Sequence, residues 1–213
     1  MTWTPKPDHV TAKQTGGEQY KPHPEGGYPS VCVDVIDLGE RVDTYMGPGS
    51  GHGKTSIQHR AALCYATGER REDGELFIVS REFTVSMGDK ANLRRFLEDW
   101  RGRKYTPAQL EEGAPLHKLA GQPGFIWIEH KPSKSNPDRV YANIRQITPL
   151  PKGVEPPVIE KYERPAYWAE KKAGYAEGLA KYRAALVPAH AGAAGEDDDF
   201  PPPAEPEDDD LPF

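Results

Sequence analysis

The sequence predicts a mainly β fold, in which five strands form one body and a helix lies between the third and the fourth strand. Three observations predict it. Apolar and polar residues alternate in several segments between residues 30 and 147, which is the pattern of half-buried strands. Residues 28–150 also hold nearly all the β-branched and aliphatic residues of the chain. The clearest apolar repeat at helical spacing falls inside this body, at 90–100.

The strands follow in order along the body. The first is predicted at Ser30–Leu38, where valine occupies every second position from Val31. Ile57–Ala66 repeats this alternation, and Leu76–Val85 is long enough to curve around a barrel and take part in two sheets. Phe125–His130 and Val140–Ile147 complete the set.

The helix expected at 90–100 presents one apolar stripe, which is assigned to the core. Asp89 or Ser86 is expected to cap its first turn, because short polar side chains accept hydrogen bonds from the free N–H groups there. The stripe consists of Leu93, Phe96, Leu97 and Trp100.

Two further helices are predicted. A short one starts at Thr106, with a proline in its first turn and Gln109 in the capping-box position. The other lies near 165–187 and is expected to dock on the barrel or on a second copy of the chain, which would make a homo-oligomer. Its apolar stripe consists of Trp168, Tyr175, Leu179, Tyr182 and Leu186.

Three strands, a helix and two strands is the order of the OB-fold, a five-stranded barrel whose helix closes one end. An SH3-like barrel, which lacks the large helix, and an unclosed sheet are the alternatives. We expect an OB-fold domain at 28–150, preceded by a flexible segment at 1–27. A linker and the last helix follow at 151–187, and a disordered acidic tail at 188–213.

The charge of the chain is divided between this body and the tail. Nine of the 33 acids lie in 196–213, which holds no base, so residues 1–195 carry 24 acids against 27 bases. The formal charge of −6 therefore conceals a body with a net charge of +3. A mildly basic body tethered to an acidic peptide is the distribution expected of a nucleic-acid binder.

The acidic run at the end of the sequence finishes in an apolar tip, EDDDLPF. It resembles the acidic tip of bacterial and phage single-stranded-DNA-binding proteins, which docks replication and repair enzymes through its terminal Phe. The alternative is a solvated tail with an accidental Phe. The resemblance implies a binding site for replication or recombination proteins that consists of Asp208, Asp209, Asp210, Leu211, Pro212 and Phe213.

Segments of the body resemble the same class of protein. IDLG, VSREFTVSM, LRRFLEDWRGRKYT and YANIRQITPLPKG are similar to segments of phage single-stranded-DNA-binding proteins with OB-folds, over about residues 28–155. This resemblance implies that the protein binds single-stranded DNA without strong sequence preference, in DNA replication, recombination or repair.

Binding of single strands requires cations that follow the phosphates and aromatic faces on which bases stack. Solvated surface is the alternative for each cation, and core packing for each aromatic residue. The candidate cations are Lys54, Arg60, Arg81, Arg101, Arg103, Lys104, Lys131, Lys134, Arg139 and Arg145. The candidate stacking residues are Tyr45, Phe77, Tyr105, Trp127 and Tyr141.

Other classes of function fit poorly. The glycine-rich stretch 47–55 resembles a phosphate-binding P-loop, but position 48 is proline and the residues after it alternate like a strand. Neither a catalytic constellation nor zinc-like spacing of ligands is present, so an enzyme, a metal site and a cofactor are not expected.

The N-terminal residues lack a signal peptide, no apolar run is long enough for a membrane, and reduced thiols are expected for Cys32 and Cys64. We therefore expect a cytoplasmic protein, in the host cell if the chain is phage-encoded.

The sequence leaves two alternatives to single-stranded-DNA binding. One is a protein-interaction module, such as a DNA mimic that acts through its acids, but a mimic should be acidic in its folded part. The other is a nucleotide-using enzyme built on the glycine-rich loop.

Overall fold

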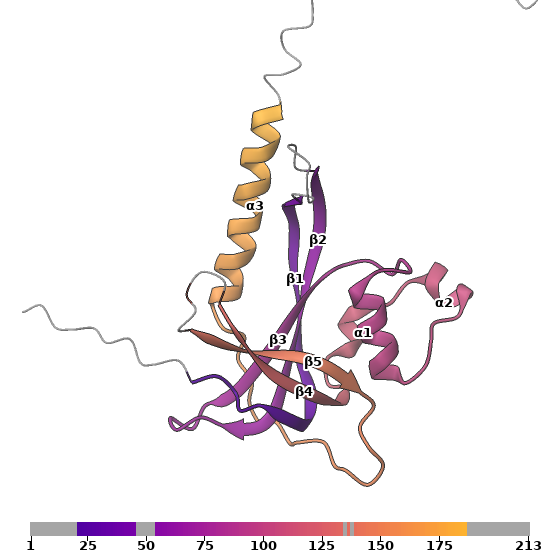
Figure 1. Ribbon diagram of the computed structural model, residues 1–213, viewed down its shortest axis with the longest axis vertical. Coiled ribbons are helices and arrows are strands. Elements are labelled where there is room, and N and C mark those ends of the chain that lie inside the picture. Colours follow the sequence, from indigo (N-terminus) through magenta and orange to yellow (C-terminus); the bar gives the residue numbers. More distant parts are fainter. Residues whose placement is uncertain (1–20, 46–53, 134–135, 137–138, 187–213) are drawn as a thin grey trace, which may run out of the picture.

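The computed structural model describes residues 21–45, 54–133, 136 and 139–186, with Tyr45 and Lys54 described by their backbone alone. Within these ranges the chain forms one antiparallel five-stranded sheet with the order β3-β2-β1-β4-β5 and few helices (Figure 1). The protein is therefore mainly β, as predicted. The strands are β1 (Gly26–Tyr45), β2 (Lys54–Arg70), β3 (Leu76–Thr84), β4 (Pro123–Pro132) and β5 (Val140–Thr148).

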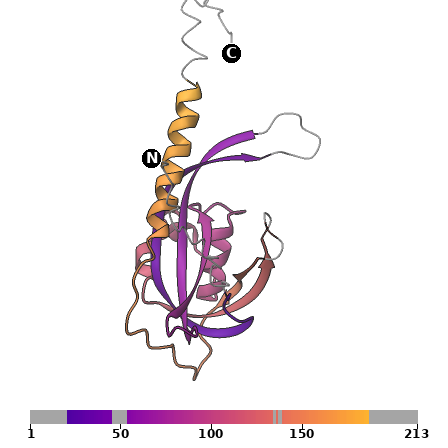
Figure 2. The same ribbon diagram turned by 90° about the vertical axis from the view of Figure 1, so that its left-hand side faces the viewer.

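Strand β1 joins the two halves of the sheet. Its first residues, Gly26 to Val31, pair with β4, and the rest of the strand, from Val31 to Tyr45, pairs with β2. The far part of the β1–β2 hairpin projects beyond the other strands (Figure 2). Among the described strands β3 pairs with β2 alone, so a part for the third strand in two sheets stays a prediction.

The sheet is not closed by hydrogen bonds in the described part of the chain, since β3 and β5 are its two edges and no strand pairing joins them. The edges nevertheless approach each other, because the Arg81 guanidinium on β3 donates to the carbonyl oxygen of Ile144 on β5. Closure into a barrel stays a prediction.

Helix α1 (Asn92–Arg101) supplies one side of the main core. Its predicted stripe is buried beside Tyr65 of β2 and Ile126 of β4. The predicted cap is wrong: Ala91 occupies the N-cap position with no side-chain hydrogen bond, and Asp89 instead pairs with Arg94. Between α1 and β4 lie α2 (Pro107–Glu112), which has the predicted capping box, and the 3₁₀ helix η1 (Leu116–Leu119).

The opposite face of the sheet is covered by helix α3 (Tyr167–Leu186), the last predicted helix. It runs along the β1–β2 hairpin (Figure 1). Trp168 packs against a second buried cluster that contains Ile36, Leu38 and Cys64. This intramolecular packing is one of the two dockings that the sequence allowed.

The structure also shows the state of the two cysteines and of the residues that precede the sheet. Cys32 and Cys64 are free, and they belong to different buried clusters. Gly26 and Gly27 already lie in β1, and His23 is buried with a 2.7 Å hydrogen bond between its Nε2 and Thr67, although 1–27 was expected to be flexible. In the described ranges we find no helix with the length and apolar character needed to span a membrane.

Candidate nucleic-acid interface

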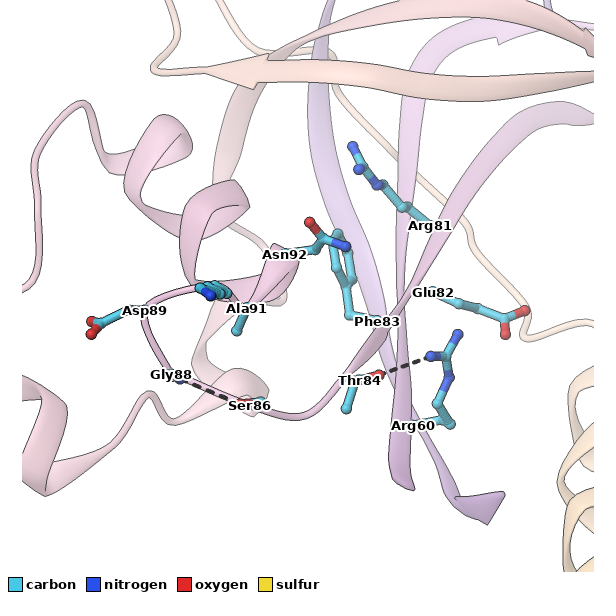
Figure 3. A pocket seen from close by; sticks show the side chains of 11 residues that line it. Arg60, Arg81, Glu82, Phe83, Thr84, Ser86, Gly88, Asp89, Ala91 and Asn92 are labelled. Atoms are coloured by element: carbon cyan, nitrogen blue, oxygen red, sulfur yellow. Dashed lines mark hydrogen bonds between the residues drawn. The ribbon is translucent and has the colours of Figure 1, made fainter. Parts of the chain in front are cut away.

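A cavity lies between strands β2 and β3 and the chain that enters α1 (Figure 3). Its volume is about 690 Å³. The side chains of Arg60 and Arg81 lie along it, and the carboxylates of Glu82 and Asp89 point in opposite directions (Figure 3). The residues that line it are Arg60, Arg81, Glu82, Phe83, Thr84, Ser86, Gly88, Asp89, Lys90, Ala91 and Asn92.

The charges around this first cavity do not cancel. Glu82 pairs with Lys171 of α3, and Asp89 pairs with Arg94 at 2.5 Å. Neither of these two bases lines the cavity. By contrast, none of the three bases in the lining has an ion-pair partner in the described ranges: Arg60, Arg81 and Lys90. The cavity therefore presents excess positive charge to a ligand.

Arg60 is held in place by the strands on which it lies. The register pairs it with Thr84 of β3, and its Nη1 donates to the Thr84 hydroxyl at 2.9 Å. That hydroxyl in turn donates to Gln58 at 2.7 Å. The Nε of Arg60 is buried and has no hydrogen-bond partner among the described atoms. A buried N–H group without a hydrogen-bond partner lowers the stability of the fold.

Arg81 is fixed by both backbone and ring contacts. Its Nη1 donates to Ile144 O at 3.0 Å and more weakly to Arg145 O at 3.4 Å, while its guanidinium lies over the rings of Phe83 and Phe96. Desolvation by burial lowers its pKa from the usual range of arginine, partly offset by the charge of Glu129. Because arginine titrates far above neutral pH, the side chain stays cationic.

Two smaller cavities continue this surface towards β4 and β5. The second, of about 350 Å³, shares Arg81 and Glu82 with the first. The third, of about 410 Å³, shares Glu129 and Arg145 with the second and includes Trp127. The three cavities thus share lining residues in turn from edge strand β3 to edge strand β5, and we call the surface that they line the seam groove.

The seam groove unites four of the predicted cations with one predicted aromatic residue. Lys131 pairs with Glu129 at 2.6 Å, which neutralises that carboxylate, whereas the Arg145 side chain forms no ion pair in the described part of the chain. The predicted residues in the groove are Arg60, Arg81, Lys131, Arg145 and Trp127.

The predicted cationic cluster after α1 lies outside the three cavities and has structural contacts of its own. The guanidinium of Arg101 stacks on the ring of Tyr105 at 4.1 Å, and Lys104 pairs with Glu98 at 2.8 Å. Lys104, followed by Tyr105 N–H and Arg94, lowers the pKa of Glu98 to about 2 against the opposing effect of burial. Arg103 is exposed. These contacts stabilise the C-terminal end of α1, where cations offset the helix dipole.

The other predicted residues lie elsewhere or outside the described ranges. Phe77 packs between His23, at 5.0 Å, and Arg71, at 6.0 Å. Arg139 lies over the ring of Tyr141 at 5.1 Å, beyond the groove lining. Outside the described residues or side chains are Tyr45, Lys54, Lys134, Asp208, Asp209, Asp210, Leu211, Pro212 and Phe213.

The sequence reasoning missed Lys90, Ser86 and Asn92 as parts of a binding surface. Lys90 could have been found, because it begins the helix expected at 90–100, and the N-terminal end of a helix favours anionic ligands. The role of the loop became visible only when α1 packed beside β3. The described residues contain no group of three or more side chains suited to a metal ion.

Comparison with known proteins adds no further assignment. The chain matches no protein-family model, and no curated protein or solved structure matches it.

Proposed function

We propose that the protein binds single-stranded DNA along the seam groove, without strong sequence preference. The observation that carries the proposal is the first cavity, where three cations have no carboxylate partner among the described residues while both acids pair with bases outside the lining. Phosphates supply the negative charge that such a surface lacks, and backbone contacts of this kind do not depend on base sequence.

We also propose that the sheet is an OB-fold that is partly open between β3 and β5. In the OB-fold, oligonucleotides bind on the face of the second and third strands. The support is that β2 and β3 supply Arg60 and Arg81 to the first cavity, and that Arg81 reaches across to β5.

In this proposal the protein is a binding protein rather than an enzyme, and it acts in replication, recombination or repair in the cytoplasm. Residues 208–213 recruit replication or recombination proteins, as the resemblance of this segment implies. Because they lie outside the described residues, this part of the proposal rests on sequence alone.

A titration tests the proposal. Fluorescence anisotropy of a labelled dT oligonucleotide is compared with that of a duplex of equal length, at two salt concentrations. We expect tighter binding of the single strand and a marked loss of affinity as salt rises. Equal affinity for both, or no salt response, contradicts the proposal, and no binding of either favours the protein-interaction alternative.

Charge variants locate the site. Lys90→Gln and Arg60→Gln each remove one cation of the first cavity that has no ion-pair partner in the described part of the chain, and both should weaken binding to the single strand. Lys118→Gln is the matched control, because Lys118 is exposed on η1 and lines none of the three cavities. Thermal denaturation of each variant separates a lost contact from a lost fold. If Lys118→Gln weakens binding as much as Lys90→Gln, the seam groove is the wrong surface.

A further inference from the structure

Trp127 on β4 is the exposed tryptophan of the described chain. It is 47% exposed, whereas Trp100 and Trp168 are 7% and 2% exposed and belong to the two buried clusters. Its ring lies in an edge-on pair with Phe125, at 5.7 Å between centroids. A single exposed aromatic residue is common on soluble proteins, so exposure by itself assigns no role.

The backbone beneath this ring is shaped to receive it. The β1–β4 register pairs Gly27 with Trp127. A Cβ atom at Gly27 would lie 2.8 Å from Cε1 of Phe125 and 3.1 Å from Cζ3 of Trp127. Gly27 does not adopt the left-handed conformation that favours glycine, so the space, rather than the backbone angle, requires glycine here. The two rings therefore lie against the bare backbone of β1.

The surroundings of the ring favour a nucleobase. Trp127 lines the third cavity with Arg145 and Gln146, a cation and an amide. The two acids of that cavity are engaged: Glu25 accepts a hydrogen bond from His130 N at 2.6 Å, and Glu129 pairs with Lys131. A base can stack on the ring while Arg145 contacts the adjoining phosphate.

The other candidate aromatic residues are placed differently. The ring of Tyr105 is covered by Arg101, and Phe77 lies between His23 and Arg71. Neither lines any of the three cavities.

We infer that Trp127 is a base-stacking platform of the seam groove and that Gly27 is the residue that positions it. This inference rests on the proposed function and deepens it, because it assigns base recognition to the β4–β5 end of the groove. The β2–β3 end, with Arg60 and Lys90, then holds phosphate.

The test compares a dT oligonucleotide with an abasic deoxyribose-phosphate chain of equal length. The wild-type protein should bind dT more tightly than the abasic chain, and dT should quench its tryptophan fluorescence. Trp127→Ala should weaken dT binding by about 5- to 150-fold, the measured range for loss of one stacked base. It should also bind dT and the abasic chain alike, while Trp127→Phe retains most of the preference. A merely structural role for Trp127 would lower affinity for both ligands together.

Gly27→Ala tests the positioning role. We expect a reduced quench and a reduced preference for dT, with affinity for the abasic chain unchanged. Gly178→Ala is the matched control, because a Cβ placed at Gly178 on α3 would meet no described heavy atom within 4 Å apart from its chain neighbours and the backbone of its own helix. If Gly27→Ala does not fold, the comparison of Trp127→Ala with Trp127→Phe decides the inference.

The two proposals fail separately. If the wild-type protein binds neither chain, the proposed function is wrong. If it binds dT but Trp127→Ala keeps the wild-type preference for dT over the abasic chain, the stacking inference alone is overturned.

Discussion

Arg81 on β3 donates a hydrogen bond to the carbonyl oxygen of Ile144 on β5, with 3.0 Å between Nη1 and the oxygen. This contact links the two edge strands of the sheet across the seam groove. The same side chain lines the first and second cavities, so one residue both ties the edges together and supplies charge to the groove.

Arg81→Ala should lower the free energy of unfolding by about 1.5–3 kcal/mol, the usual worth of a hydrogen bond from a charged donor. Urea denaturation measures it. Arg145→Ala is the control, because it removes the same charge from the groove while the Arg145 side chain makes no hydrogen bond in the described part of the chain. Equal stability of the two variants would show that the bond to β5 contributes nothing.

The salt dependence of single-strand binding should report the number of phosphates contacted. Four to six contacts predict a log–log slope of roughly −3 to −4, at about −0.7 for each phosphate on a single strand. Lys90→Gln should make the slope shallower by about 0.7. Titrations at several salt concentrations measure both, and a slope near zero would remove the electrostatic basis of the proposal.

Glu98 should make stability depend on pH in acid. Its hydrogen bond with Lys104 leads the contacts that hold its pKa at about 2, below the ordinary 4.5. A carboxyl with a lowered folded-state pKa contributes stability that is present above about pH 4.5 and is lost as pH falls towards 2. Glu98→Gln should therefore be less stable at pH 7 and lose less stability between pH 4.5 and pH 2.

Urea midpoints across that pH range measure this effect. Glu111→Gln is a suitable control, since Glu111 is exposed on α2. A pH profile for Glu98→Gln that parallels the wild type would contradict the assignment.

Trp168→Ala should destabilise the protein by about 3–5 kcal/mol, because a buried ring leaves a large cavity when it is truncated. Trp168 lies in the first turn of α3 and is 2% exposed, packed against the sheet. Leu186→Ala on the same helix is the control, because Leu186 is 48% exposed and should cost little. Denaturation in urea measures both, and a small effect at Trp168 would mean that α3 docks weakly.

Deletion of residues 207–213 should leave single-strand affinity unchanged or tighter, chiefly at low salt. The acidic run is tethered to a body with a net charge of +3, at an effective concentration on the order of millimolar, so it can compete weakly with DNA. Anisotropy titrations of full-length and shortened protein measure this. Loss of DNA binding on deletion would place the segment in the groove or the fold.

Phe213→Ala separates the apolar anchor of this segment from its charge. We expect unchanged DNA binding, because every acid remains, and loss of most of the affinity for a partner protein. Binding of the variant to a single-stranded-DNA-processing enzyme, measured by calorimetry, tests it. If the variant binds the partner as tightly as the wild-type protein does, the acidic residues alone account for recognition.

Elements governed by neighbours in sequence were predictable. The stripe of α1 and the capping box at Thr106 depend on contacts within one or two turns, and both are observed. The cap of α1 was not predicted correctly, because the helix begins at Asn92, which leaves Ala91 at the N-cap position while Asp89 pairs with Arg94.

The burial of β2 shows where local pattern fails. Ile57–Ala66 was expected to be half-buried, yet residues 61–66 are all buried. The reason is α3, more than a hundred residues later, whose Trp168 covers Ala62 and Cys64 on the far face of the sheet.

The sequence by itself determined the order of strands and helices, the aromatic core stripe and the separation of a basic body from an acidic segment. These follow from side-chain periodicity and charge, which can be read from neighbouring residues. Only the tertiary structure decided which cations share a surface. Arg60 and Arg81 meet because β2 pairs with β3, whereas Lys104 is engaged by Glu98. Whether a charge is free to meet a ligand depends on partners that folding brings from distant parts of the chain.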